Sequence, residues 1–151
     1  MTLNLSEVYI ERCDKDSEDV IAQEQASFLS TSITHLKQHM NEFIYIETDA
    51  FEPIKTDSLS IEVDDVFKTY IVLFGLKVQK KHASTIKAYL EENLHGENVY
   101  SSMMFSGEDG LWDINLPIDN MEGFHEDMTL QEAVSLIYGF LVPLIKSTQE
   151  Q

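Results

Sequence analysis

The sequence predicts an α+β fold, in which an antiparallel sheet is covered by helices. Apolar residues alternate with polar ones at Leu59–Val63 and on both sides of an Asp109-Gly110 turn, which is typical of strands and of a hairpin. Apolar residues recur at helical spacing in His82–Leu94 and in Thr129–Lys146. The predicted order is α-β-β-β-α-β-β-α, which describes one domain over residues 1–151.

A first helix is predicted over Asp14–Asn41. Asp16 or Ser17 can cap its beginning. Its apolar residues are spaced by three and four, as expected for a helix that lies on a sheet; they are Ala22, Ala26, Leu29, Ile33, Leu36 and Met40. Residues 1–13 before it are either an ordered arm or a flexible terminus.

Three strands are expected after this helix, over Phe43–Thr48, Leu59–Val63 and Val66–Gln79. The third is apolar on both faces around Tyr70–Phe74, so we expect it to be central in the sheet. A second helix over His82–Leu94 then leads into a hairpin of Val99–Phe105 and Leu111–Pro117.

The last helix begins with Thr129-Leu130-Gln131-Glu132. This is a capping box, in which the side chains of the first and fourth residues satisfy each other's free backbone donors. A broad apolar face follows it, made of Leu130, Ala133, Val134, Ile137, Phe140, Leu141, Leu144 and Ile145.

The chain is strongly acidic, with 10 basic and 27 acidic residues and a net charge of −17. Arg12 is its only arginine. Phosphate backbones and anionic lipid surfaces repel such a protein, so we expect neither nucleic acid nor membrane as a partner. The charge favours either a basic partner or simple solubility. No apolar run approaches the roughly 20 residues that span a bilayer.

Cysteine usage and the N-terminus both favour the cytoplasm. Cys13 is the only cysteine, so no internal disulfide and no thiolate metal site can form, which suits a reducing compartment. The first residues lack the basic and apolar regions of a secretory signal.

The sequence offers no catalytic motif. It contains no Gly-x-Ser-x-Gly, no phosphate-binding glycine loop and no dinucleotide fingerprint. His35 and His39 have the spacing of a metal pair on a helix, but Lys37 lies between them and the glutamate of a zincin motif is missing. We therefore expect two solvent-facing histidines, no metal, no cofactor and a protein that is not an enzyme.

Val99–Phe105 is the most distinctive candidate for a binding surface. On an alternating strand only one of Met103 and Met104 can face the core, so the other meets a helix, a partner or solvent. Methionine adapts to varied neighbours, so this strand suits either a dimer interface or a groove for peptides. Burial of both faces inside the chain is the alternative.

The element order and the C-terminal half resemble the superfamily of type III secretion chaperones and YbjN-like proteins. The resemblance covers about residues 17–147. It is carried by the strand that ends at Tyr70–Val78, the helix from Lys81, the hairpin Val99–Phe105 and Leu111–Ile118 with its Asp109-Gly110 turn, and the helix from Thr129 to Lys146.

The resemblance implies a homodimer that holds a partner protein in the cytoplasm. Its dimer interface would include Ile86, Tyr89, Leu90, Tyr100, Met103, Met104 and Phe105. A segment of the partner would wrap over Leu29, Ile33, Leu36, Phe43 and Tyr45. The function predicted in this way is a non-enzymatic, acidic chaperone or adaptor. The alternatives are an immunity or inhibitor protein that blocks a basic toxin, and a YbjN-like protein with another regulatory role.

Overall fold

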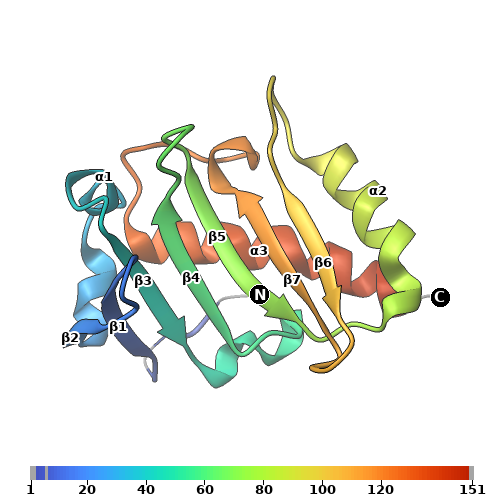
Figure 1. Cartoon of the computed structure of the whole chain (residues 1–151), viewed down its shortest axis with the longest axis horizontal. Coiled ribbons are helices and arrows are strands. Elements are labelled where there is room, and N and C mark those ends of the chain that lie inside the picture. Colours follow the sequence, from blue (N-terminus) through green and yellow to red (C-terminus); the bar gives the residue numbers. More distant parts are fainter. Residues whose placement is uncertain (1–2, 6, 150–151) are drawn as a thin grey trace.

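A seven-stranded sheet is the centre of the computed structural model, which describes residues 3–5 and 7–149 (Figure 1). Its strands are β1 (Tyr9–Asp14), β2 (Val20–Glu24), β3 (Glu42–Glu47), β4 (Ser58–Val63), β5 (Tyr70–Leu76), β6 (Ser102–Ser106) and β7 (Leu111–Pro117). They lie in the order β2-β1-β3-β4-β5-β7-β6, and all neighbours are antiparallel. The α+β prediction is confirmed.

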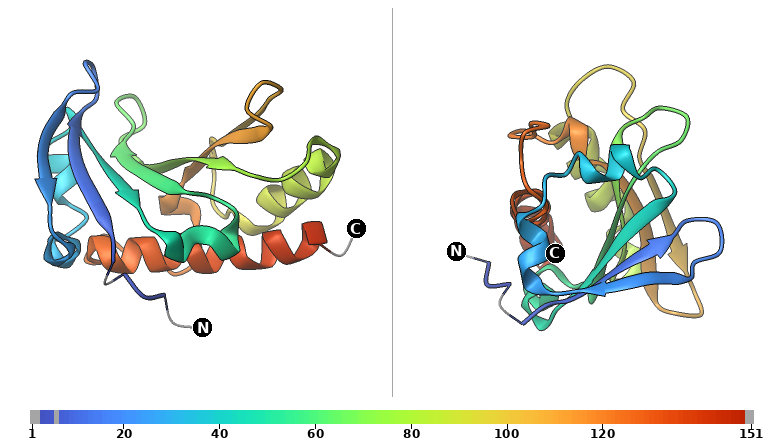
Figure 2. Two further views of the ribbon diagram at one scale, coloured as in Figure 1. Left: turned by 90° about the horizontal axis from the view of Figure 1, so that it is seen from below. Right: turned by 90° about the vertical axis from the view of Figure 1, so that its left-hand side faces the viewer.

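The helices cover one face of this sheet, which we call the inner face. They are α1 (His35–Gln38), α2 (Ala83–Asn93) and α3 (Leu130–Gln149), and short 3-10 turns include η1 (Ala26–Ser30) and η2 (Asp49–Ile54). Helix α3 crosses behind the strands in Figure 1 and runs along the length of the sheet in Figure 2. Helix α2 joins β5 to β6 and packs beside α3.

The core lies between the inner face and α3, where every second residue of a strand is buried. Ile44 and Ile46 of β3 and Leu59 and Ile61 of β4 are fully buried in this way. The predicted apolar face of α3 is also buried, except that Phe140 is only half-buried. Strand β5 has both neighbours and buries residues on both faces, as the sequence predicts for a central strand.

The predicted helix over Asp14–Asn41 is wrong. That segment instead contains the β1–β2 turn, strand β2, η1 and the four-residue helix α1. Strand β1 begins at Tyr9 and pairs with both β2 and β3, so residues 9–13 of the N-terminal segment belong to the sheet. Residues 1, 2 and 6 lie outside the described part of the chain.

The turn after β1 uses the same kind of side-chain bond that caps a helix. The Asp14 carboxylate accepts the backbone N–H groups of Asp16 and Ser17, both at 2.9 Å, which is the same bond that caps a helix. Glu18 then adopts the left-handed conformation, with φ of +64°, and the chain reverses into β2. Local capping chemistry is common to turns and helices, so only the pairing of β1 with its neighbours decides between them.

The other predicted elements are confirmed in place and type. Helix α2 and the four strands β3, β4, β5 and β7 overlap their predicted ranges, and β6 occupies the second half of the range predicted for it. Helix α3 begins with the predicted capping box: Thr129 N donates to Glu132 Oε1 at 3.0 Å, and Glu132 N donates to Thr129 Oγ1 at 3.1 Å.

Candidate functional site

Strand β6 forms one edge of the sheet. Among the described residues it pairs with β7 alone, so its other side carries no strand. Its sequence, Ser-Met-Met-Phe-Ser, contains no lysine or proline, the residues that commonly protect an edge from further pairing. Met104 lies on the outer face with 71% of its surface exposed, directly opposite Asp113 of β7. The edge is therefore open both to backbone pairing and to side-chain contact.

A groove of about 550 Å³ lies between α2 and the segment that leads into β6. Its wall residues are Lys87, Leu90, Glu91, Leu94, Gly96, Val99, Ser101 and Met103. Gly96 takes a φ of +116°, which ends the turn after α2 and lets the chain return toward the sheet. The apolar wall atoms suit apolar side chains of a bound segment, and the two charged wall residues, Lys87 and Glu91, carry opposite charges.

An exposed aromatic pair lies near the beginning of β6. The rings of Phe67 and Tyr100 are stacked with centroids 4.1 Å apart and planes 11° from parallel. Phe67 comes from the β4–β5 turn, and the exposed fractions are 47% for Phe67, 52% for Tyr100 and 77% for the adjacent Val66. The Asp64 carboxylate shapes this turn by accepting the N–H of Phe67 at 2.9 Å. We call Val66, Phe67 and Tyr100 the aromatic patch.

The structure divides the predicted dimer interface into exposed and buried residues. Tyr100 and Met104 are exposed, and Met103 and Phe105 are half-buried on the inner face. Ile86 and Leu90, by contrast, are only 0% and 5% exposed. They face the chain's own core, so their assignment to a dimer interface is wrong.

Tyr89 also packs inside the chain, against α3. Its hydroxyl donates to the Phe140 carbonyl, and its ring contacts the Phe140 ring edge-on at 5.2 Å. Burial raises the pKa of the Tyr89 hydroxyl. Helix α2 therefore uses Tyr89 to bind α3, which leaves the half-buried ring little surface for a second molecule.

The predicted partner-binding residues divide in a similar way. Leu29, Ile33 and Leu36 are at most 1% exposed, so their assignment to a binding surface is wrong. The reason is that no long helix presents them, and η1 and α1 turn their apolar side chains into the core. Phe43 and Tyr45 are half-buried on the outer face of β3, and the Tyr45 ring meets that of Tyr9 edge-on at 6.4 Å.

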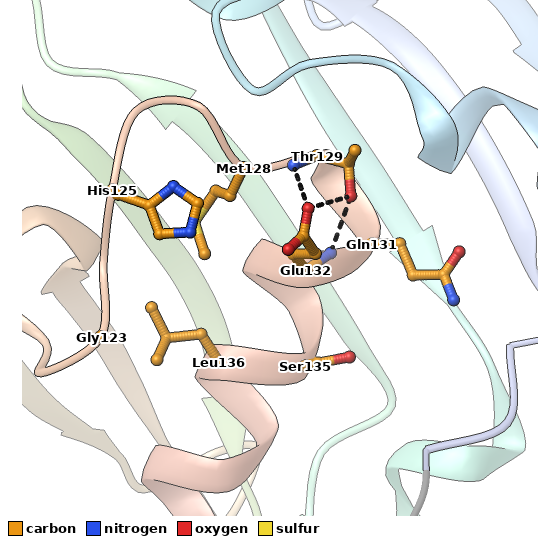
Figure 3. A pocket seen from close by; sticks show the side chains of 8 residues that line it. All are labelled: Gly123, His125, Met128, Thr129, Gln131, Glu132, Ser135 and Leu136. Atoms are coloured by element: carbon orange, nitrogen blue, oxygen red, sulfur yellow. Dashed lines mark hydrogen bonds between the residues drawn. The ribbon is translucent and has the colours of Figure 1, made fainter.

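A second hollow, of about 490 Å³, lies beside the beginning of α3 and is drawn in Figure 3. The figure labels His125, Met128 and Leu136 around it and marks the bonds between Thr129 and Glu132. The carboxylate of Glu132 accepts from both the backbone and the hydroxyl of Thr129. This acid is thus engaged in capping the helix, and the hollow offers no free general base from that position.

A network of ion pairs lies on the inner face, at the end of the sheet that β2 forms. Arg12 donates through Nε and Nη2 to the two oxygens of Glu42, at 3.0 and 2.9 Å, and through Nη1 to Glu24 at 3.2 Å. Glu42 is only 4% exposed. The Arg12 guanidinium lowers the pKa of the Glu42 carboxyl to about 2, against the opposing effect of burial.

The prediction that His35 and His39 face solvent is wrong. His35 and His39 are both half-buried, and His35 Nε2 lies 3.1 Å from Glu42 Oε1. The sequence gives no sign of the Arg12–Glu42 contact, because its two partners lie thirty positions apart. The aromatic patch had a weak signal, since Val66 and Phe67 are apolar residues directly after the Asp64-Asp65 turn.

Comparison of the chain with protein-family models, with curated proteins and with solved structures finds no match. The resemblance to secretion chaperones and YbjN-like proteins stays a prediction. Among residues 3–5 and 7–149, no helix is both long and apolar enough to span a bilayer.

Proposed function

We propose that this protein is a non-enzymatic binding protein that holds an extended segment of a partner polypeptide along strand β6. The observation that carries the proposal is the open edge of β6 beside the α2 groove. An extended segment can add a strand to such an edge through backbone hydrogen bonds, while its alternate side chains enter pockets on one face. The chaperone or adaptor role is the general form of this function.

The chemistry of the surface specifies the segment. Strand addition places successive side chains on opposite faces, so one set would lie beside the exposed Met104, with Asp113 one strand further on, and the other set would face the groove. Asp113 contributes negative charge on the outer face, within a chain of net charge −17, whereas Lys87 and Glu91 in the groove carry opposite charges. Basic side chains therefore suit the outer face and apolar ones the groove. A segment in which basic and apolar residues alternate fits both faces.

A cytoplasmic location and a partner protein are parts of this proposal. Cys13, the only cysteine, is 3% exposed and unpaired with another cysteine, which suits a reducing compartment. The partner need not be large, because backbone pairing supplies affinity over a short length of chain.

The experiment measures binding of a labelled peptide of alternating Lys and Val by fluorescence anisotropy. A second peptide has the same sequence with N-methyl groups on alternate amides, so that it cannot pair with an edge. We expect the first peptide to bind and the second to bind at least about tenfold more weakly, a difference of about 1.4 kcal/mol. Hydrogen exchange should slow in Ser102–Ser106 when the peptide is bound.

Two matched variants locate the site. Met104→Lys places a positive charge on the β6 edge, and Val20→Lys makes the same kind of change on β2, where Val20 is 54% exposed. Met104→Lys should weaken binding by at least about tenfold because it repels a basic segment and protects the edge. Val20→Lys should leave binding within about twofold of the parent protein.

Three outcomes would overturn the proposal. Equal effects of the two variants would place the peptide elsewhere. Binding of folded basic proteins but of no peptide, with strong salt sensitivity, would indicate an inhibitor of the toxin-blocking kind. A dimer in solution that Met104→Lys dissociates, without peptide binding, would assign the β6 edge to a second copy of the chain.

A further inference from the structure

Two histidines and a glutamate converge on the inner face at the β2 end of the sheet. His35 begins α1, His39 is the residue that ends it, and Glu42 is the first residue of β3. One nitrogen or oxygen from each can be chosen so that all three atoms lie within 4.8 Å of one another. Imidazole and carboxylate groups together form a common ligand set for zinc and similar divalent metals.

The hydrogen bonds around His39 prepare it as a ligand. Its Nδ1 lies 2.9 Å from the carbonyl oxygen of His35. A carbonyl can only accept, so Nδ1 carries the proton and the neutral ring keeps a lone pair on Nε2. Metal-binding histidines typically have this arrangement, with the non-ligating nitrogen donating to a carbonyl or carboxylate. The His39 ring stacks on that of His35, with centroids 4.2 Å apart and planes 19° from parallel, so the two rings already lie side by side.

Glu42 is fixed on the opposite side by Arg12. The guanidinium binds both carboxylate oxygens, while Oε1 also faces His35 Nε2 at 3.1 Å. A metal that binds between Oε1 and Nε2 would replace the hydrogen shared by those two atoms, and the neutral His35 ring would then carry its single proton on Nδ1. The second carboxylate on Arg12, that of Glu24, gives this group of three charged residues a net charge of −1. A dication is therefore not opposed by an excess of positive charge.

Lys37, the residue that argued against a metal in the sequence, is directed elsewhere. Its ammonium pairs with Glu126 and lies 4.9 Å from the centre of the Tyr70 ring. The acidic ligand that the helix lacks is Glu42 of β3, seven residues after His35. The close return of the chain from α1 into β3 is what brings the three residues together.

We propose that His35, His39 and Glu42 bind a divalent transition-metal ion such as Zn²⁺, with water in the remaining position. Zinc–ligand distances of about 2.0–2.2 Å place tetrahedral ligand atoms roughly 3.4 Å apart. The His35–Glu42 pair already has that spacing, and the widest separation of 4.8 Å must close by about 1.4 Å. Turning the half-buried His39 ring out of its stack on His35 can supply this movement, and it also lets the two in-plane nitrogen lone pairs converge. The site is independent of the β6 edge.

The test uses the full chain, titrated with zinc chloride in a calorimeter, and with cobalt chloride followed by visible absorption. We expect one Zn²⁺ per chain, an increase in the melting temperature with zinc, and cobalt bands characteristic of nitrogen and oxygen ligands. Magnesium chloride should neither bind in this way nor displace zinc, since Mg²⁺ prefers oxygen ligands.

Variants identify the ligands. His39→Ala should weaken zinc affinity by about a hundredfold, and His39→Phe should do the same while it retains a ring that stacks on His35. The matched control is His125→Ala, which removes an exposed histidine outside the cluster and should leave the affinity unchanged. Circular dichroism and the melting temperature of each zinc-free variant establish that it is folded.

The proposal is overturned if the parent chain shows neither heat nor a rise in melting temperature with excess zinc. It is also overturned if folded His39→Phe binds zinc as tightly as the parent, which would indicate adventitious binding to the acidic surface. Displacement of zinc by magnesium would lead to the same conclusion. Loss of peptide binding at β6 has no bearing on any of these outcomes.

Discussion

Two tyrosines allow the same substitution to be compared in opposite environments. The hydroxyl of Tyr70 is buried with no hydrogen bond of ordinary length among the described residues; burial, and then the nearby Glu126 and Asp119 carboxylates, raise its pKa. That of Tyr89 donates to the Phe140 carbonyl. A buried polar group that makes no hydrogen bond costs about 1–3 kcal/mol, and an ordinary hydrogen bond contributes about 1 kcal/mol. Tyr70→Phe should therefore stabilise the protein, and Tyr89→Phe should destabilise it.

The expected magnitudes follow from those two figures. Tyr70→Phe keeps the ring that Lys37 contacts and removes only the hydroxyl, so we expect a gain of about 1 kcal/mol in the free energy of unfolding. Tyr89→Phe should lose about 1 kcal/mol, which gives a difference of about 2 kcal/mol between the variants. In a chain of this size the difference corresponds to roughly 4–8 °C in melting temperature.

The assay is urea unfolding followed by the fluorescence of Trp112, the only tryptophan, which is 5% exposed in the core. Equal slopes of free energy against urea would establish that both variants unfold as the parent does. The reasoning is refuted if Tyr70→Phe loses stability by as much as Tyr89→Phe. That result would mean that the Tyr70 hydroxyl has a hydrogen-bond partner in solution.

Two further substitutions test the cap of α3 and the half-buried carboxylate of Asp119. Thr129→Ala removes the capping hydroxyl of α3 and should cost about 1 kcal/mol, measured by urea unfolding; no loss would mean that the capping box contributes nothing. Burial raises the pKa of Asp119, whose carboxylate accepts the Tyr70 N–H at 2.6 Å. The folded state then holds this proton more readily than the unfolded state, so the contribution of Asp119 to stability is greatest below about pH 4 and falls as pH rises through its folded pKa. Asp119→Asn keeps an acceptor oxygen and should be more stable than the parent at pH 7, with the advantage disappearing below about pH 4. The control, Asp109→Asn at an exposed position, should show little change at either pH. An Asp119→Asn variant that is no more stable than the parent at pH 7 would contradict this.

The binding-site residues illustrate how far sequence patterns reach. Alternation alone predicts that one of Met103 and Met104 faces away from the core, and the structure shows that it is Met104, with Met103 and Phe105 facing inward. Alternation says nothing about what lies beside a strand, so the position of β6 at the edge and the groove against α2 were not predictable. The assignment of Leu29 and Ile33 to a binding surface was wrong for a related reason. Helical spacing of apolar residues also occurs in an irregular segment that is buried by its neighbours.

The sequence by itself determined the elements whose signals are local. Period-two alternation placed β4 and β7, short apolar runs placed β3 and β5, and the Thr129–Glu132 capping box placed the beginning of α3. Each of these signals depends on residues close together in the chain. Tertiary structure alone decided that Asp14 is the last residue of a strand and not the first of a helix, because β1 gains backbone partners on both sides. It also decided that Arg12, Glu42 and His35 meet, because distant segments become neighbours only when the sheet forms.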